Sequence, residues 1–527
     1  MKREPLNYIL GYKKIFILTG IITLVHFAIS FFTDKVAFRG NNSSLLKYLV
    51  LKGLFFVVLF FVWFFIINFI VKIKDGNQKY INWAKIAICF FVIYSVIMIL
   101  IWPGNWIWDE IVILEKARNL ELFPWHHFLT SFFYIFSMMI MPFPAFIVIT
   151  QYAIITFIVG YIISVLQARY GNKAILIGLF FIIPPILANV FYPMRLILYS
   201  FIELLFIILI ITNMKNGSKV DKKTLIIIMI LNVLLSVWRT EGIFLIVVLP
   251  IALIIKKYKK KTILLISVIM ISIATCIIGM QSHLSNNYDR NSIDYSVTGI
   301  VLPYHDLLKT EYKENHNSQI INSAKQYLNI NEVNKYSRGE TAFWADVYSR
   351  VDNGEKFKKM IGDYKSLIMK RPQAFIKNRV ECLLSSQQLY NKNGKIISVV
   401  HQGNTDQRYR NIDDYTLGRP ISRSIREKTL NCFYAKTGIS FIDILIKYSY
   451  NLVIPLVILI IMAIFSLIKI KKRAVLFVIA ASLLIQFFAI FITAPATFFM
   501  YYLPIYVCAY MLLFIYLLDR KEKQIFS

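Results

Sequence analysis

Charged residues are scarce in this sequence. Only 17% of the 527 residues are Asp, Glu, Lys or Arg, whereas 57% are hydrophobic. Soluble globular domains carry about 25% charged residues. The hydrophobic residues occur in long blocks, and the mean hydropathy is +0.60. This composition excludes a single soluble domain, and it also excludes a disordered chain.

Acidic residues are particularly few, with 29 Asp and Glu against 59 Lys and Arg, which gives a net charge of +30. In a soluble protein such an excess of positive charge would point to nucleic acid. In a membrane protein it has a simpler cause, because cytoplasmic loops collect Lys and Arg. The positions of the charges along the chain therefore decide between these interpretations.

The sequence has only five cysteines. Cys89, Cys276 and Cys508 fall in apolar blocks, where we expect them to be packing residues. Cys382 and Cys432 fall in a long polar segment, and in an oxidising compartment they could form a disulfide. No Cys/His spacing resembles a structural zinc site. The sequence also has no internal repeat and no low-complexity tract.

The apolar blocks are long enough to cross a bilayer, whose core of about 30 Å needs about 20 apolar residues per helix. They predict an all-α polytopic membrane protein with about twelve transmembrane helices. The predicted spans are 15–32, 53–71, 86–102, 143–166, 175–192, 196–212, 224–238, 243–256, 262–280, 448–468, 474–493 and 499–518.

The distribution of Lys and Arg predicts the orientation of these spans. With a cytoplasmic N-terminus, the short inner segments hold 26 basic residues and the short outer segments hold 8. This asymmetry is typical of a plasma-membrane protein whose two termini are both cytoplasmic. The segment Phe128–Met141 must then lie along the outer surface instead of crossing, and Pro142 and Pro144 would end it.

A long polar insertion separates the last three spans from the others. Residues 281–446 contain 24 basic and 17 acidic residues, with helix-like runs near 317–329, 354–369 and 372–389. Pro372 suits the first turn of a helix. We predict a mostly helical extracytoplasmic domain here. The expected organisation is two added spans in 1–85, a transmembrane core in 86–280 with an acidic outer loop at 103–142, this domain, and three final spans in 447–527.

The first outer loop after the third span contains the most informative motif. It reads Trp102-Pro-Gly-Asn-Trp-Ile-Trp-Asp-Glu110 and ends in Pro124-Trp-His-His127. Three Trp residues near a span exit suit the membrane interface. The adjacent acids Asp109 and Glu110 follow at the same boundary. Without further information, this is a solvated loop with an aromatic belt.

The position of this acidic loop resembles that of the GT-C glycosyltransferases, which include protein O-mannosyltransferases and aminoarabinose transferases of lipid A. The triplet Trp108-Asp109-Glu110 is similar to the acidic motif of their first loop. Segments 111–121 and 128–141 are similar to their two juxtamembrane helices. The resemblance begins at the third span, covers about 86–280 and extends loosely to the last three spans.

The resemblance implies transfer of a sugar from a polyprenyl-phosphate carrier, without a nucleotide sugar, to an extracytoplasmic envelope acceptor. In an inverting transfer, a carboxylate accepts the proton of the attacking hydroxyl. Asp109 is the candidate base, and Glu110 is a second acid, a hydrogen-bond partner or a metal ligand. The leaving phosphate needs cationic stabilisation. The expected partners are the carrier-linked sugar, an envelope glycan or other acceptor, and the bilayer, with no nucleic acid.

Candidates for binding the carrier phosphate lie at outer span ends and in the acidic loop. Arg195 and Arg239 each have a guanidinium that can grip a phosphate through two hydrogen bonds. Either one could instead anchor a lipid headgroup or pair with an acid, and Glu241 is the obvious partner of Arg239. His126 and His127 could contact the phosphate or a divalent metal, or simply pack. No cofactor is assigned, and metal dependence stays open.

Three further residues are candidates for lining the carrier cavity: Glu203, Glu241 and Trp108. Glu203 lies inside the span 196–212, where an ionised side chain costs about 2.5–3.5 kcal/mol. Such a residue usually faces a cavity or a partner, and Arg195 lies about two turns away on the same helical face. The alternative is a neutral, hydrogen-bonded structural Glu.

Two other functions remain open from the sequence. A polysaccharide polymerase or ligase of the envelope has a similar span count and a large outer loop, but relies on outer Arg and His. A lipid-linked sugar flippase or transporter would be expected to have repeated halves and broken helices, and the sequence has no such repeat.

Overall fold

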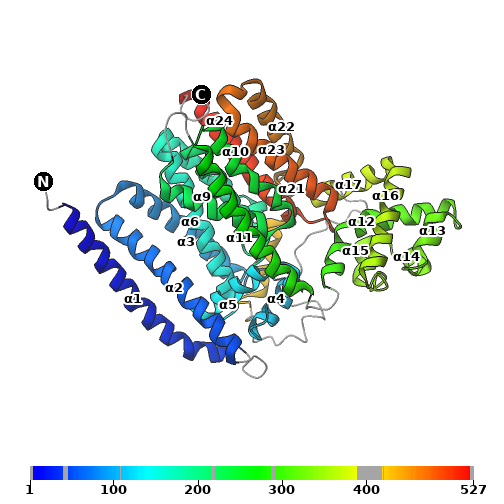
Figure 1. The fold of residues 1–527 in the computed structure, drawn as a ribbon, viewed down its shortest axis with the longest axis horizontal. Helices are drawn as coiled ribbons and strands as arrows, with labels where there is room; N and C mark the ends of the chain where they lie inside the picture. Colours follow the sequence, from blue (N-terminus) through cyan, green and yellow to red (C-terminus); the bar gives the residue numbers. More distant parts are fainter. Residues whose placement is uncertain are drawn as a thin grey trace. The chain divides into compact units, whose positions relative to one another are not determined.

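The computed structural model describes residues 4–38, 45–106, 108–214, 220–286, 291–387, 418 and 420–522. Every regular element in these ranges is a helix, which confirms the predicted all-helical fold (Figure 1). The chain forms two compact units. The first comprises Met1–Leu198 and Val400–Ile439, and the second comprises Tyr199–Val399 and Ser440–Ser527.

Nine helical segments among the described residues are long and apolar enough to cross a membrane, which supports the prediction of a multi-pass protein. They are Lys13–Ala37, Leu45–Lys74, Gln78–Leu100, Ala145–Ile182, Arg195–Asn213, Lys260–Asn286, Ser440–Ile468, Ile470–Thr493 and Phe499–Asp519.

The remaining predicted spans have other local structures. The segment 175–192 falls on a 3-10 helix that prolongs α6, followed by a short helix. The segment 224–238 lies in a helix of 17 residues, and 243–256 lies in the shorter apolar stretch Thr240–Ile255. Hydropathy thus identified an apolar segment at each of these three positions. It did not distinguish one long α-helix from a series of shorter helices.

The first unit is built from ten helical elements and the start of an eleventh. They are α1 (Glu4–Ala37), α2 (Leu45–Lys74), α3 (Gln78–Leu100), α4 (Trp108–Arg118), η1 (Pro124–His126), α5 (Phe128–Ile140), α6 (Ala145–Tyr170), η2 (Gly171–Ile182), α7 (Pro184–Val190), α20 (Arg423–Phe433) and the first residues of α8 (Arg195–Asn213).

Small residues allow α3 and α6 to pack closely, and these two helices make the most extensive contact in the unit. A Cβ atom at Gly160 would lie 2.8 Å from the Cβ of Ala87. Any side chain at position 160 would therefore push the helices apart. Close packing through small residues is a usual way for apolar helices to associate in a membrane.

A buried ion pair joins α1 to α2, which run side by side (Figure 1). Lys52 Nζ lies 2.5 Å from Asp34 Oδ2, and the two residues are 1% and 5% exposed. Lys52 also donates to Ser30 Oγ, and the Tyr48 hydroxyl donates to Asp34. Asp34 and Lys52 fall in the outer loop 33–52 that the sequence predicts between the first two spans, whereas the structure places both inside helices.

The second unit contains the rest of α8 and the following elements. They are α9 (Lys222–Trp238), η3 (Thr240–Val247), α10 (Val248–Ile255), α11 (Lys260–Asn286), α12 (Asn291–Glu314), α13 (Gln319–Ala324), α14 (Ile330–Lys335), α15 (Gly339–Trp344), α16 (Gly354–Lys370), α17 (Pro372–Ser386), α21 (Ser440–Ser449), α22 (Val453–Ile468), α23 (Ile470–Thr493), η5 (Phe499–Tyr502) and α24 (Leu503–Glu522).

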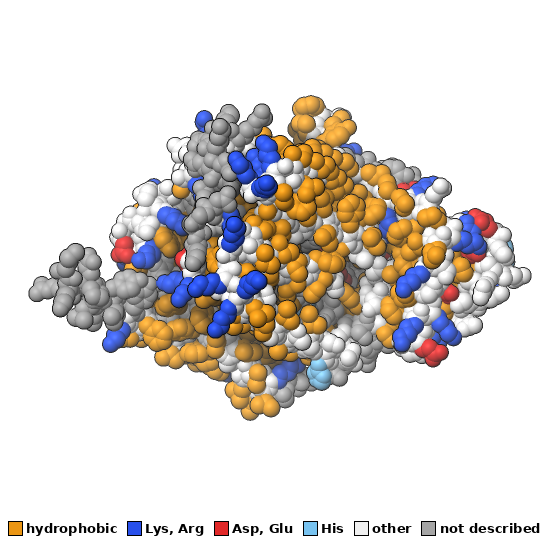
Figure 2. All heavy atoms as spheres, turned by 45° about the horizontal axis from the view of Figure 1, so that its top comes forward, with side chains coloured by type: hydrophobic (Ala, Val, Ile, Leu, Met, Phe, Trp, Pro, Cys, Tyr) orange, Lys and Arg blue, Asp and Glu red, His pale blue; other side chains and the backbone are white. Residues whose placement is uncertain are grey.

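Helices α12 to α17 form a cluster with its own hydrophobic core, built around buried residues such as Tyr304, Leu308, Tyr327 and Met360. The expected helices at 354–369 and 372–389 correspond closely to α16 and α17, and Pro372 opens α17 as predicted. Only part of the run at 317–329 is α-helical, as α13. Figure 2 shows many charged side chains on this cluster and hydrophobic side chains over much of the rest of the visible face.

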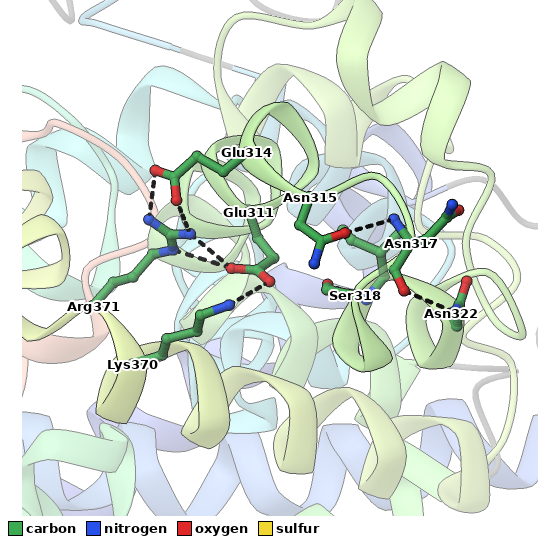
Figure 3. Close-up of polar contacts among 9 residues, drawn as sticks. Glu311, Glu314, Asn315, Asn317, Ser318, Asn322, Lys370 and Arg371 are labelled. Atoms are coloured by element: carbon green, nitrogen blue, oxygen red, sulfur yellow. Dashed lines mark hydrogen bonds and ion pairs between the residues drawn. The ribbon is translucent and has the colours of Figure 1, made fainter.

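Four charged side chains tie the end of α12 to the junction of α16 and α17 (Figure 3). Lys370 and Arg371 both bind Glu311, at 2.7 and 2.8 Å, and Arg371 also binds Glu314 through two hydrogen bonds. Burial of Glu311 acts to raise the pKa of its carboxyl, but these hydrogen bonds outweigh that effect and lower the pKa to about 2. The carboxylate therefore stays ionised and paired near neutral pH.

A fully buried arginine fastens this cluster to the end of α23. The Arg379 guanidinium donates to the carbonyl oxygens of Ile492 and Ala494, at 3.3 and 3.0 Å. It also donates twice to Asn378 Oδ1, at 2.7 and 3.0 Å. The last carbonyls of a helix have no partner within the helix and carry negative partial charge. Arg379 satisfies them from a neighbouring element.

We expect Arg379→Met to destabilise the protein by about 2–4 kcal/mol, because hydrogen bonds from a charged group are lost and buried acceptors are left unsatisfied. The matched control is Lys377→Met, which makes the same kind of change at an exposed position of the same helix. Thermal unfolding of the purified protein in detergent measures both effects. Equal midpoints for the two variants would contradict this role of Arg379.

All five cysteines are free, so the structure contains no disulfide between Cys382 and Cys432. Cys382 is buried on α17, and its thiol lies 3.8 Å from the carbonyl oxygen of Ala496. Cys508 is also buried, in agreement with the expectation of packing, but Cys89 and Cys276 are exposed on the surfaces of their helices.

Candidate functional site

The chain leading to the acidic motif is held firmly within the first unit. The backbone N–H of Asn105 donates to Phe191 O at 2.9 Å, and Arg426 on α20 donates to Gly104 O at 2.9 Å. Trp106 is only 3% exposed, and its indole N–H donates to Pro103 O. The ring of Trp106 therefore packs inside the protein.

Asp109 and Glu110 lie in the first turn of α4. A helix N-terminus carries positive partial charge, which favours carboxylates at this position. The two acids differ in environment. The Asp109 side chain is 33% exposed, whereas Glu110 is fully buried. Asp109 is thus the more accessible of the two acids.

The short turn η1 brings His126 to Asp109. The His126 Nε2 atom lies 3.4 Å from Asp109 Oδ2, a contact that becomes an ion pair when the imidazole is protonated. His126 is 8% exposed, and neither ring nitrogen hydrogen-bonds within the part of the chain that the structure describes. The Thr130 hydroxyl donates to His126 O at 2.6 Å and fixes the backbone of the turn.

His127 connects η1 to α5 in a strained conformation. Its φ is +69°, a value that a residue with a side chain rarely adopts. Its ring caps α5, because Leu129 N–H donates to His127 Nδ1 at 3.3 Å. Burial, and secondly the charge of Arg195, lowers the pKa of His127 to about 3. His127 is therefore neutral near pH 7, and Arg195 lies close enough to influence it.

The stability of the protein should fall as the pH drops below about 6.5. The unfolded chain then binds a proton at His127 while the folded protein does not, so up to about 1.4 kcal/mol is lost per pH unit until the pH nears 3. His127→Asn removes this contribution, because Asn tolerates positive φ and caps helices but does not titrate. Thermal unfolding between pH 7 and pH 4.5 should show a flatter dependence for the variant. An unchanged slope would contradict the assignment.

Tyr134 belongs to the same site, although the sequence analysis did not select it. It is fully buried on α5, and its hydroxyl donates to Pro193 O at 2.8 Å. Burial raises the pKa of Tyr134 well above its usual value, and the charges of Glu110 and Asp109 raise it further. The sequence does not indicate that Tyr134 lies near Asp109 and Glu110, because their proximity depends on how α4 and α5 pack against each other.

A second polar cluster lies in the second unit and contains the other predicted site residues. Arg239 is 6% exposed and forms an ion pair with Glu241, as the sequence suggested. Its guanidinium also lies 5.5 Å from the centre of the Tyr199 ring. Gly242 makes this turn possible, since a Cβ there would lie 2.2 Å from Leu235 O.

Glu203 is fully buried in the same unit. It accepts a hydrogen bond from Gln486 Nε2 of α23 at 3.2 Å, and Arg239 and Tyr199 lie close enough to interact with it electrostatically. Gln486 was missed, although it stands as a polar residue within an apolar span, which is a usual sign of a functional or paired position.

The predicted site residues thus form two groups. The first group belongs to the first unit and comprises Asp109, Glu110, His126, His127 and Arg195. Within it, Asp109 contacts His126, and burial and the charge of Arg195 lower the pKa of His127.

Glu203, Arg239 and Glu241 form the second group, in the second unit. The side chain of Trp108 and the segment 401–410 lie outside what the structure describes. Among the described residues, no three His, Cys, Asp or Glu side chains converge as metal ligands.

Comparison with known proteins gave no match for this chain among protein-family models, curated proteins or solved structures.

Proposed function

We propose that this protein is a membrane glycosyltransferase that moves a sugar from a polyprenyl-phosphate donor to an extracytoplasmic acceptor of the cell envelope. The observation that carries the proposal is the contact between Asp109 and His126. It combines a reachable carboxylate on a helix N-terminus with a buried imidazole on a rigid turn. A general base has to lie within reach of the proton that it takes up, and the partly exposed Asp109, with an imidazole beside it, suits that role.

In the proposed reaction, a hydroxyl oxygen of the acceptor attacks the anomeric carbon of the donor sugar. A new C–O bond forms, Asp109 takes the hydroxyl proton, and the bond from the anomeric carbon to the phosphate oxygen breaks with its electron pair on the phosphate. The configuration at the anomeric carbon inverts. His126 lies beside Asp109, with its Nε2 atom 3.4 Å from Asp109 Oδ2, and Glu110 is the buried neighbour of Asp109 on the same helix turn.

The leaving phosphate requires positive charge. Arg195 is the candidate within the first unit, because it lies close enough to His127 to affect its pKa. Arg239 is less suited to grip phosphate while it is paired with Glu241. We assign to Arg239 and Glu203 a separate role in shaping the polar interior of the second unit.

The proposal includes a membrane topology of twelve spans with both termini in the cytoplasm. The nine long apolar helices support its multi-pass character. Helices α4 and α5 would then lie along the outer surface, and the α12–α17 cluster would be extracytoplasmic. Thiol labelling in intact cells tests this, with Lys358→Cys as the single cysteine of a variant whose five native cysteines are replaced by Ser. A membrane-impermeant reagent should label it.

Comparison of envelope glycans from cells with and without the protein tests the function. Mass spectrometry should show one sugar substituent lost when the gene is deleted, together with accumulation of the carrier-linked donor. Identical glycan spectra with no accumulated donor would contradict the proposal. Accumulation of donor on the cytoplasmic face alone would instead favour a flippase.

A further inference from the structure

A hollow on the α12–α17 cluster has the composition of an anion-binding site. Its volume is about 550 Å³, and it lies between the C-terminal part of α12 and the helix α14. The residues that line it are Lys309, Tyr312, Lys313, His316, Asn331 and Asn334. The lining thus combines two ammonium groups, an imidazole, two amides and one phenol, and includes no carboxylate.

The acids nearest in sequence to this hollow are engaged elsewhere. Glu311 and Glu314 bind Lys370 and Arg371, and they turn toward these two residues in Figure 3. On the other wall, Glu332 pairs with Lys335, at 2.5 Å. The lining itself therefore contains no acid to pair with Lys313, and the charge of Lys309 interacts with Asp306, which lies outside the lining.

The walls of the hollow are fixed relative to each other. Lys309 Nζ donates to the carbonyl oxygen of Tyr336 and lies 3.5 Å from that of Asn334, so α12 is joined to the end of α14. The rings of Tyr312 and His316 lie 4.2 Å apart between their centroids. Lys313 and His316 are exposed and accessible to a ligand.

We propose that this hollow binds a phosphate-bearing glycan. An exposed lysine is a point charge suited to phosphate, amides both donate to and accept from sugar hydroxyls, and an aromatic ring offers an apolar face with a polar edge to a sugar. No aliphatic side chain lines the hollow, which disfavours an acyl chain. The proposal rests on the proposed function only in taking this glycan as the acceptor of the sugar.

Binding of an oligomer of hexose units joined by phosphodiesters to the full-length protein in detergent tests the proposal. We expect Lys313→Gln and His316→Gln each to weaken binding by about 3- to 10-fold, and we expect added salt to weaken binding to the wild type. Lys358→Gln, which removes an exposed charge from α16 of the same cluster, should change the affinity less than twofold.

Several outcomes would overturn the proposal. These are no binding by the wild type, equal weakening by Lys358→Gln, equally tight binding of an uncharged maltooligosaccharide, or binding only to vesicles that contain anionic lipid. Binding requires no transfer, so Asp109→Asn should bind the oligomer as tightly as the wild type. Oligomer binding without any transfer activity would refute the proposed function alone, and transfer without oligomer binding would refute this site alone.

Discussion

Asp109→Asn should reduce sugar transfer by about 10²–10⁴-fold, the range that a general base contributes. Asn has nearly the same size as Asp, and Asp109 is partly exposed at the start of α4, so the fold should be retained. The neutral amide takes up no proton from the attacking hydroxyl. The turnover number should therefore fall, while the Michaelis constant for the donor should change little.

The matched control for this experiment is Glu115→Gln, which makes the same chemical change on the same helix. Its activity should stay within twofold of the wild type. Unfolding midpoints of both variants should match that of the wild type, which separates lost chemistry from lost structure. If Asp109→Asn retains full activity in a purified system, Asp109 is not the base, and a mechanism based on outer-loop Arg and His becomes preferable.

Lys52→Met should destabilise the protein by about 3–5 kcal/mol, because it leaves Asp34 buried without its counter-charge. The Asp34 carboxylate lies between two apolar helices, and the Lys52 ammonium is also enclosed by three phenylalanine rings, with centroids 4.7–5.4 Å away. Chemical denaturation in mixed micelles measures the loss. The exposed Lys35→Met on α1 is the control, and we expect it to have little effect.

The double variant Asp34→Leu/Lys52→Met sharpens this prediction. Replacing a buried ion pair by apolar residues of similar volume is often neutral or stabilising. The double variant should therefore be considerably more stable than Lys52→Met alone. If the two single effects simply add, the residues do not interact as the structure indicates.

The sequence predicted the helical, multi-pass character well, because hydropathy directly reports apolar blocks of spanning length. The sequence was less informative where an apolar block does not form one long α-helix. Residues Gly171–Ile182 are as apolar as a span but adopt a 3-10 helix, and Pro184 and Pro185 then open a separate short helix. Local backbone geometry of this kind depends on packing within the unit, which hydropathy does not measure.

In the candidate site, too, the sequence predicted some contacts and missed others. The sequence predicted the adjacent acids at the start of α4 and the pairing of Arg239 with Glu241, because the residues of each pair are close along the chain. The contact between Asp109 and His126 joins residues 17 positions apart and depends on the turn η1. The Lys52–Asp34 pair was missed because charges beside a span were counted as loop charges, whereas helix pairing buries them.

The most direct test of the proposed chemistry is a reaction of the purified protein with a polyprenyl-phosphate sugar that carries ¹³C at its anomeric carbon. Envelope glycan serves as the acceptor, and nuclear magnetic resonance follows the labelled carbon. The account predicts a new glycosidic linkage to the acceptor with inverted anomeric configuration, and no such product with Asp109→Asn. Product of retained configuration, or product formed equally by Asp109→Asn, would contradict it.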